Sequence, residues 1–251
     1  MPVPAFALAA EAAVRAASLN LCTDETLLLL AGPQQVVSVS HLSRDPLESS
    51  LWGAARRVPG NDGSLENVLA RRPTLLLTMG GSGRARAALA RKLGIRLLDL
   101  PYPQSPEEVI GQARQVAAAL GRPATAERYA AALARLQASR PALQDGAFLG
   151  QGGQSLTPGS LSARWLALSG IRQRPLAGNR LTLEVLATQP PKWLLRSDYR
   201  SAQGSRAQTW LNHPLVRRLG PRMRITDGRA WTCGGLPMLA ETIRLRQVIA
   251  R

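Results

Sequence analysis

The stretch SLENVLARRPTLLLT at residues 64–78 returns in altered form as TLEVLATQPPKWLLR at residues 182–196. In each copy a Ser or Thr comes first, a glutamate (Glu66 or Glu184) follows two residues later, and a proline precedes an apolar run. The hydroxyl residue can cap a short helix, the proline ends that helix, and the run has the length of a buried strand. Because this unit occurs twice and far apart, the sequence predicts two similar lobes.

Predicted strands and helices alternate along the rest of the chain. We expect strands at 14–21, 35–40, 74–78, 96–100, 147–149 and 223–226. We expect helices at 24–31, around Trp52, and at 84–93, 106–120, 124–139, 161–168, 207–211 and 238–250, with Thr23 as the cap of the first. Alternation of this kind favours parallel sheets, and such sheets bind ligands outside the carboxyl ends of their strands.

The repeated pattern Leu-Glu-x-x-Leu, proline and buried strand resembles the substrate-binding proteins of ABC importers for metal chelates, the periplasmic receptors for ferric siderophores, haem and cobalamin. The resemblance extends over roughly residues 17–250. It implies an α/β fold of two Rossmann-like lobes with mainly parallel sheets, joined by one long helix, with the ligand cleft between them. We place the N-terminal lobe at 17–121, the connecting helix at 122–142 and the C-terminal lobe at 143–251.

The same resemblance implies a binding function without covalent chemistry. The expected protein is a periplasmic monomer that needs no cofactor, binds a metal chelate and delivers it to a dimeric permease in the inner membrane. Residues 1–16 are small and apolar, and Ala7-Leu8-Ala9 is similar to a signal cleavage site, although a basic n-region is missing. We expect a remnant of an export signal there, with a disordered or helical tail as the alternative.

Composition leaves a second function class to consider. The chain has 251 residues and a net charge of +16, and all but Lys92 and Lys192 of its 32 basic residues are arginines. A nucleic-acid-binding protein is the alternative that this charge raises. The arginines are scattered rather than gathered on one helix or tail, so a genome that favours arginine codons, with a few arginines kept for an anionic ligand, accounts for them better.

Sequence motifs of enzymes are missing. The two histidines, His41 and His213, have no Cys, His or Asp at metal-site spacing, and the chain contains no GxSxG elbow and no CxxC. The glycine-rich residues 80–83 lack the Lys-Ser/Thr of a phosphate-binding loop. A two-lobed enzyme of nitrogenase-like build is the alternative, but it would need more cysteines for a cofactor. We therefore expect a binding protein with no catalytic residues and no metal site of its own.

Candidate ligand contacts are the polar and aromatic residues that follow predicted strands. They are His41, Arg44, Arg84, Tyr102, Arg196, Tyr199 and Trp231. Arginine pairs well with carboxylates, and aromatic rings can stack on a flat ligand. The alternatives are a structural or solvated histidine and aromatic rings in the lobe cores. A polar glycine-rich loop at 150–159 also follows a predicted strand.

Two pairs of residues, one member in each predicted lobe, complete the expectations. In the resembling family, one glutamate at the tip of each lobe docks onto arginines of the permease, and Glu66 and Glu184 match that position. Cys22 and Cys233, the only cysteines, both fall at predicted strand–helix junctions. We rank two free thiols first, a disulfide second and a pair of soft metal ligands third.

Overall fold

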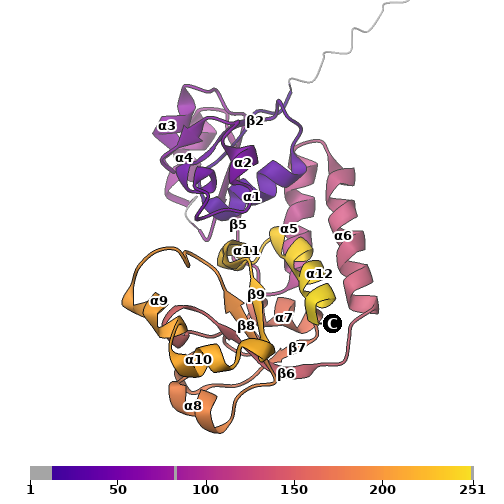
Figure 1. The fold of residues 1–251 in the computed structure, drawn as a ribbon. Helices are drawn as coiled ribbons and strands as arrows, with labels where there is room; N and C mark the ends of the chain where they lie inside the picture. Colours follow the sequence, from indigo (N-terminus) through magenta and orange to yellow (C-terminus); the bar gives the residue numbers. More distant parts are fainter. Residues whose placement is uncertain (1–12, 82–83, 250–251) are drawn as a thin grey trace, which may run out of the picture.

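Two parallel β-sheets, each covered by helices, form the two lobes of the computed structural model, which describes residues 13–81 and 84–249 (Figure 1). The expected export-signal remnant falls mostly on residues 1–12, which lie outside the described residues. The first sheet has the order β3-β2-β1-β4-β5. Its strands are β1 (Ala16–Ser18), β2 (Val36–Ser40), β3 (Gly60–Asn61), β4 (Leu75–Met79) and β5 (Arg96–Leu100). Its helices are α1 (Leu21–Leu30), α2 (Trp52–Ala55), α3 (Leu65–Leu69) and α4 (Arg84–Lys92), with a 3-10 turn η1 (His41–Arg44).

The second sheet has the order β7-β6-β8-β9, which repeats the order β2-β1-β4-β5 of the first. Its strands are β6 (Gln144–Leu149), β7 (Ile171–Gln173), β8 (Trp193–Ser197) and β9 (Met223–Thr226). Its helices are α7 (Leu161–Leu168), α8 (Leu183–Thr188), α9 (Arg206–Leu211), α10 (Pro214–Arg218), α11 (Gly228–Cys233) and α12 (Pro237–Ile249), with 3-10 turns η2 (Gln151–Gly153), η3 (Ala177–Asn179) and η4 (Gly220–Arg222). Every strand pairing is parallel, as predicted.

The repeated sequence unit forms the same structure in both lobes. Ser64 caps α3 by accepting the backbone N–H of Asn67, and Thr182 caps α8 by accepting that of Val185. Each helix leads into a strand, β4 or β8, that pairs with the first strand of its sheet, β1 or β6. The prediction of two similar α/β lobes is therefore confirmed.

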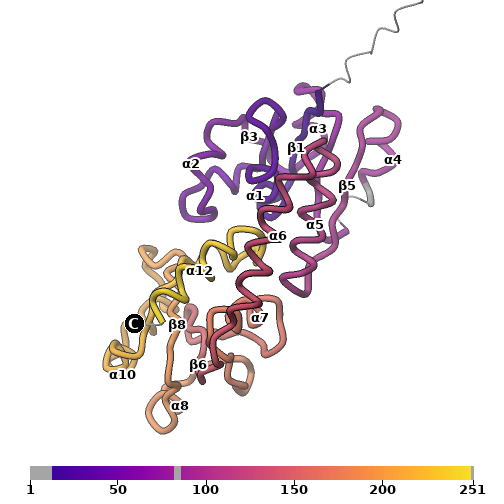
Figure 2. Tube along the Cα trace, turned by 90° about the vertical axis from the view of Figure 1, so that its right-hand side faces the viewer, coloured from indigo at the N-terminus to yellow at the C-terminus, as the bar shows by residue number. Residues whose placement is uncertain are grey.

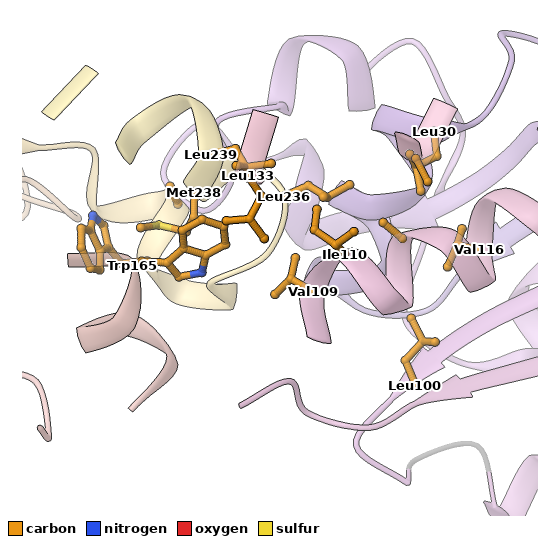
Figure 3. Packing of buried hydrophobic residues seen from close by; sticks show 14 of the residues in the cluster. Leu30, Leu100, Val109, Ile110, Val116, Leu133, Trp165, Leu236, Met238 and Leu239 are labelled. Atoms are coloured by element: carbon orange, nitrogen blue, oxygen red, sulfur yellow. The ribbon is translucent and has the colours of Figure 1, made fainter. Parts of the chain in front are cut away.

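Helices α5 (Pro106–Ala119) and α6 (Pro123–Ala138) connect the lobes, and α6 runs alongside both of them (Figures 1 and 2). Helix α12 returns to pack against α6 and α7. One apolar cluster extends through this region from Leu30 and Val116 in the first lobe to Met238 and Trp165 in the second (Figure 3). Because the lobes share this core, large separation of the lobes would expose apolar surface at a cost of about 25 cal/mol per Å².

The structure corrects the expected start of the first helix. Helix α1 begins at Leu21, and its cap is Asn20, whose side-chain oxygen accepts the backbone N–H of Thr23. Thr23, the cap expected from the sequence, is not the cap: its side chain is buried and hydrogen-bonds to the Ser18 hydroxyl. Both residue types can cap a helix, so the sequence alone favours neither position.

Candidate functional site

A cavity of about 510 Å³ lies at the carboxyl ends of three strands of the second sheet. Residues that line it follow β6, β8 and β9, or end them. They are Phe148, Gly150, Gln151, Gln154, Ser155, Leu156, Ser197, Tyr199, Arg200, Gly228, Trp231 and Thr232. This is the edge at which open parallel sheets bind ligands, and the volume is within the usual range of small-molecule sites.

Aromatic rings form one wall of the cavity. The ring centroids of Phe148 and Trp231 lie 5.0 Å apart, with the planes tilted by 50°. The indole N–H of Trp231 donates to the hydroxyl of Thr226 at 2.7 Å, so this polar group of the ring is satisfied within the protein. The parts of the two rings that line the cavity therefore form an apolar surface.

Tyr199 sits at the rim of the cavity because Gly228 leaves room for it. A Cβ atom at Gly228 would lie 2.4 Å from the Cβ of Tyr199 and 2.2 Å from the hydroxyl of Ser197, closer than real atoms approach. The backbone N–H of Gly228 also donates to Asp198 at 2.8 Å, which fixes the start of α11 against the loop after β8. Burial raises the pKa of the Tyr199 phenol, so the group stays protonated at neutral pH.

The first lobe reaches the rim of the cavity through the segment between η1 and α2. Glu48 accepts a hydrogen bond from the Tyr199 hydroxyl at 2.7 Å and forms an ion pair with Arg200. Close by, Arg229 donates to the backbone carbonyl of Pro46 at 3.0 Å while pairing with Asp227 at 2.8 Å. Burial alone would raise the pKa of Asp227, but hydrogen bonds from Arg229 outweigh it and the pKa is lowered.

The structure overturns the ranking of the two cysteines. Cys22 of α1 and Cys233 of α11 form a disulfide with Cα atoms 5.3 Å apart, within the range that disulfides require. The expectation of free thiols is therefore wrong, and so is that of a pair of metal ligands. The reason is spatial: the folded lobes bring together two residues separated by 211 positions, a proximity that no local pattern encodes.

Two buried carboxyl groups, those of Asp24 and Glu25, follow Cys22 of the disulfide in helix α1. Burial raises the pKa of Asp24 to about 6, although its carboxylate accepts the backbone N–H and the hydroxyl of Ser40. Burial raises the pKa of Glu25 further, to about 8, with repulsion from Asp24 and from Asp227 of the other lobe adding to it. One oxygen of Glu25 accepts from the Ser49 hydroxyl at 2.9 Å, and the other is buried without a partner in the described structure.

The predicted ligand residues are only partly brought together. Tyr199 and Trp231 line the same cavity. Tyr102, 65% exposed, lies with its ring over Gly80, and Arg196 is half-buried in β8, outside the lining. The side chain of Arg84, at the start of α4, lies outside the described part.

His41 and Arg44 also lie outside the lining of this cavity. His41 is exposed at the start of η1, with its Nδ1 3.3 Å from the carbonyl oxygen of Asn61. The guanidinium of Arg44 packs over Gly60, where an added Cβ would meet it at 2.6 Å. Their contact with a ligand stays a prediction.

Sequence reasoning missed several residues of the site. Phe148 and Arg200 were not singled out, and neither was Glu48. Gln151 and Gln154 belong to the glycine-rich loop that follows β6, which was the one available signal for this part of the cavity. Nothing in the sequence marks Glu48, because its partners lie in the other lobe.

Glu66 and Glu184 are exposed, each in the first turn of its helix. Neither carboxylate has a hydrogen bond or ion pair within the described residues. Helices α3 and α8 lie toward opposite ends of the molecule, one in each lobe (Figures 1 and 2).

The described residues contain no group of three or more His, Cys, Asp and Glu placed to hold a metal ion. None of the helices in this part of the chain combines the length and the apolar character needed to cross a membrane.

Two parallel α/β lobes with a cavity at the strand ends define the class of two-lobed solute-binding folds. The family model described as "Periplasmic binding protein" matches residues 17–157, more than half of the chain. The chain therefore belongs to the periplasmic binding protein family. No curated protein matches the sequence.

Solved structures of low sequence identity share the whole fold. The periplasmic heme-binding protein HutB of Vibrio cholerae is 19% identical with a TM-score of 0.72, covering 95% of this chain and 99% of its own. The periplasmic heme-binding protein RhuT of Roseiflexus sp. RS-1, in apo form, is 23% identical with a TM-score of 0.67, covering 94% and 97%. Helicobacter pylori CeuE with bound Ni(II) is 16% identical with a TM-score of 0.63, covering 94% and 83%.

Proposed function

We propose that this periplasmic binding protein is the substrate-binding component of an ABC importer for a metal chelate. The observation that carries the proposal is the cavity at the strand ends, where the rings of Phe148 and Trp231 form one wall and Tyr199 and Arg200 form a polar rim. Aromatic faces suit the apolar part of a large chelate, and a phenol beside a guanidinium suits its polar edge. The heme-binding neighbours and the neighbour with bound Ni(II) support a metal-containing ligand of the siderophore, haem or cobalamin type.

Binding in this proposal involves no covalent step. The ligand enters between the lobes, the lobes close over it to a limited extent, and the loaded protein docks on the permease. The shared apolar core and the disulfide Cys22–Cys233 favour small adjustments over a wide hinge opening. His41 and Arg44, from the first lobe, are the proposed contacts on the facing side.

Tryptophan fluorescence tests the proposal directly, because Trp231 lines the cavity. A panel of a ferric siderophore, haem and cobalamin is titrated against the protein, and one class should quench the emission in a saturable way. The variant Trp231→Phe should lose much of this signal. The matched control Trp193→Phe should retain it, because Trp193 stacks on Arg224 away from the cavity, 4.4 Å from the guanidinium carbon to the ring centroid. Saturable binding by none of the panel would end the proposal.

Docking on the permease is assigned to Glu66 and Glu184. Their macrodipole stabilisation is a few tenths to about 1 kcal/mol and explains a carboxylate in a first turn, but not the same residue at the same place in both lobes. One exposed, unpaired carboxylate in each lobe suits a permease with two equivalent subunits. Because the protein has a net charge of +16, two exposed carboxylates can orient it on the permease through electrostatic complementarity.

The double variant Glu66→Ala, Glu184→Ala should keep the chelate affinity of the wild type and lose both transport and binding to the permease. The control is Glu127→Ala, which removes another exposed carboxylate, one that pairs with Arg114 on the connecting helices. Normal uptake by the double variant would remove these two residues from the docking surface while leaving the chelate-binding part of the proposal intact.

A further inference from the structure

Glu48 is buried, 6% exposed, yet its side chain has no hydrogen-bond partner among the described residues of its own lobe. Instead the carboxylate crosses to the second lobe, where one oxygen accepts from the Tyr199 hydroxyl at 2.7 Å and the other pairs with Arg200. Tyr199 and Arg200 line the cavity, whereas Glu48 is outside the lining. A carboxylate of the protein thus occupies a carboxylate-binding position at the rim of the ligand cavity.

The receiving half of this contact is held in place independently of Glu48. Gln208 donates its side-chain N–H groups to the backbone carbonyls of Tyr199 and Arg200, at 3.3 Å and 3.0 Å. Gln151 donates to the Tyr199 carbonyl at 3.0 Å. Arg200 also adopts a φ of 49°, a left-handed backbone that costs energy for a residue with a side chain. A strained turn held by two glutamines is consistent with a fixed anion receptor.

Arg200 keeps capacity for another acceptor. Its Nε is buried and has no hydrogen-bond partner among the described residues, and its side chain remains 38% exposed toward solvent. A guanidinium can hold a carboxylate with two parallel hydrogen bonds, which is stronger and more specific than one. When a ligand carboxylate takes the place of Glu48, Arg200 keeps an ion-pair partner, so its guanidinium is not left as an unpaired charge.

We propose that Tyr199 and Arg200 form the subsite for a free carboxylate of the ligand, and that Glu48 fills this subsite until the ligand displaces it. The inference rests on the proposed function and narrows it to metal chelates that carry at least one ionised carboxylate. Glu48 then acts as an internal competitor: it keeps the receptor satisfied and the lobes in contact when no ligand is present. When the ligand enters and displaces Glu48, the contact of Glu48 with Tyr199 and Arg200, which joins the two lobes, is broken.

Ligand preference gives the first arm of the test. Iron(III) protoporphyrin IX and iron(III) citrate carry free carboxylates, whereas the porphyrin dimethyl ester and ferrioxamine B carry none. We expect each carboxylate-free probe to bind at least about tenfold more weakly than its counterpart, as the loss of a charged hydrogen bond requires. Equal affinities, or binding of cobalamin and other carboxylate-free chelates alone, would overturn the inference and leave the proposed function standing. Binding of none of these would overturn both.

Variants give the second arm, measured with the carboxylate-bearing probe that binds. Glu48→Gln removes the competing charge, so more of the protein has a free subsite and the affinity should rise about tenfold. Arg200→Gln and Tyr199→Phe should lower it, the arginine variant by about tenfold or more. Each of these changes should be clearly smaller for a carboxylate-free probe, which has no group for the subsite to bind.

Glu127→Gln serves as the matched control, because Glu127 is an ion-paired glutamate on the outer surface, more than half exposed. Thermal unfolding of each variant shows whether it folds. If Arg200→Gln does not fold, Tyr199→Phe, which removes only one oxygen atom, still tests the subsite. If Glu48 were purely structural, Glu48→Gln would leave the affinity unchanged or weaken it. Either result would overturn the inference.

Discussion

At the scale of single residues, Glu25 has a carboxyl group almost removed from water at the junction of the lobes. Burial raises its pKa from 4.5 to about 8. Between these two values the folded protein keeps the proton while the unfolded chain releases it. The folded state therefore binds more protons, and the free energy of unfolding falls as the pH rises through this window, by up to about 1.4 kcal/mol per pH unit.

The variant Glu25→Gln should remove this contribution. Its gain in stability over the wild type should be small at pH 5 and should grow steadily to pH 8, because the neutral amide has no proton to lose. Urea denaturation at several pH values measures the difference, with Glu184→Gln as a control at an exposed site. Asp24 adds a change of the same sign between pH 3.8 and about 6 in both proteins. Parallel curves for the wild type and Glu25→Gln would contradict the assignment.

Residue roles were predictable only where a local pattern carried them. Tyr199 and Trp231 follow strands of the second sheet, and that position was enough to place them at the edge of the sheet where the cavity lies. Glu48 and the disulfide partners were beyond local reasoning, because their roles arise from contacts between lobes that are far apart in the sequence.

At the scale of elements, one arginine joins the ends of three helices. Arg246 of α12 donates through Nε to the carbonyl of Leu168, in the last turn of α7, at 2.6 Å. Its other nitrogens bond to the carbonyl of Leu136 and to the hydroxyl of Ser139, at the end of α6. The last carbonyls of a helix have no partners within the helix, so Arg246 satisfies groups that would otherwise need water.

Arg246→Met keeps the apolar stem and removes these donors. We expect the free energy of unfolding to fall by about 1–3 kcal/mol, since each net hydrogen bond contributes about 1 kcal/mol and the site is partly exposed. Chemical denaturation measures it. Arg91→Met, at an exposed position on α4, is the control and should change little. Equal losses in the two variants would show that Arg246 acts as an ordinary surface charge.

Elements with a clear apolar run or helical period were predicted well, and several short elements without one were missed. Strand β5 and helix α7 were placed with their observed bounds, and β4 was placed within one residue, because apolar runs and caps mark them. Strands β3 and β7 and helices α10 and α11 were missed. They have two to six residues each, too few to show a period, and they form because neighbouring elements supply hydrogen bonds and burial.

At the scale of the whole molecule, the lobes are held together by a covalent link as well as by packing. The disulfide joins α1 of the first lobe to α11 of the second. It closes a loop of more than 200 residues, and loops of that size lose much conformational entropy in the unfolded state.

Replacing both cysteines by alanine should lower the free energy of unfolding by about 3–5 kcal/mol. Thermal unfolding of the double variant is compared with the wild type before and after reduction. Reduction should bring the wild type close to the variant and should leave the variant itself unchanged. A melting temperature of the wild type that does not respond to complete reduction would contradict a stabilising role for the bridge.

Chelate binding in the cavity beside Trp231 is the central claim, and calorimetric titration of a cavity-filling variant tests it most directly. Gln154 lines the cavity, is exposed, and has no side-chain hydrogen bond within the described structure, so Gln154→Trp should fill the space without disturbing the fold. Gln115→Trp adds the same ring on the outer face of α5 and is the control. With the chelate that binds the wild type, Gln154→Trp should weaken the affinity at least about tenfold and Gln115→Trp should leave it unchanged. Wild-type affinity in a correctly folded Gln154→Trp protein would contradict the claim.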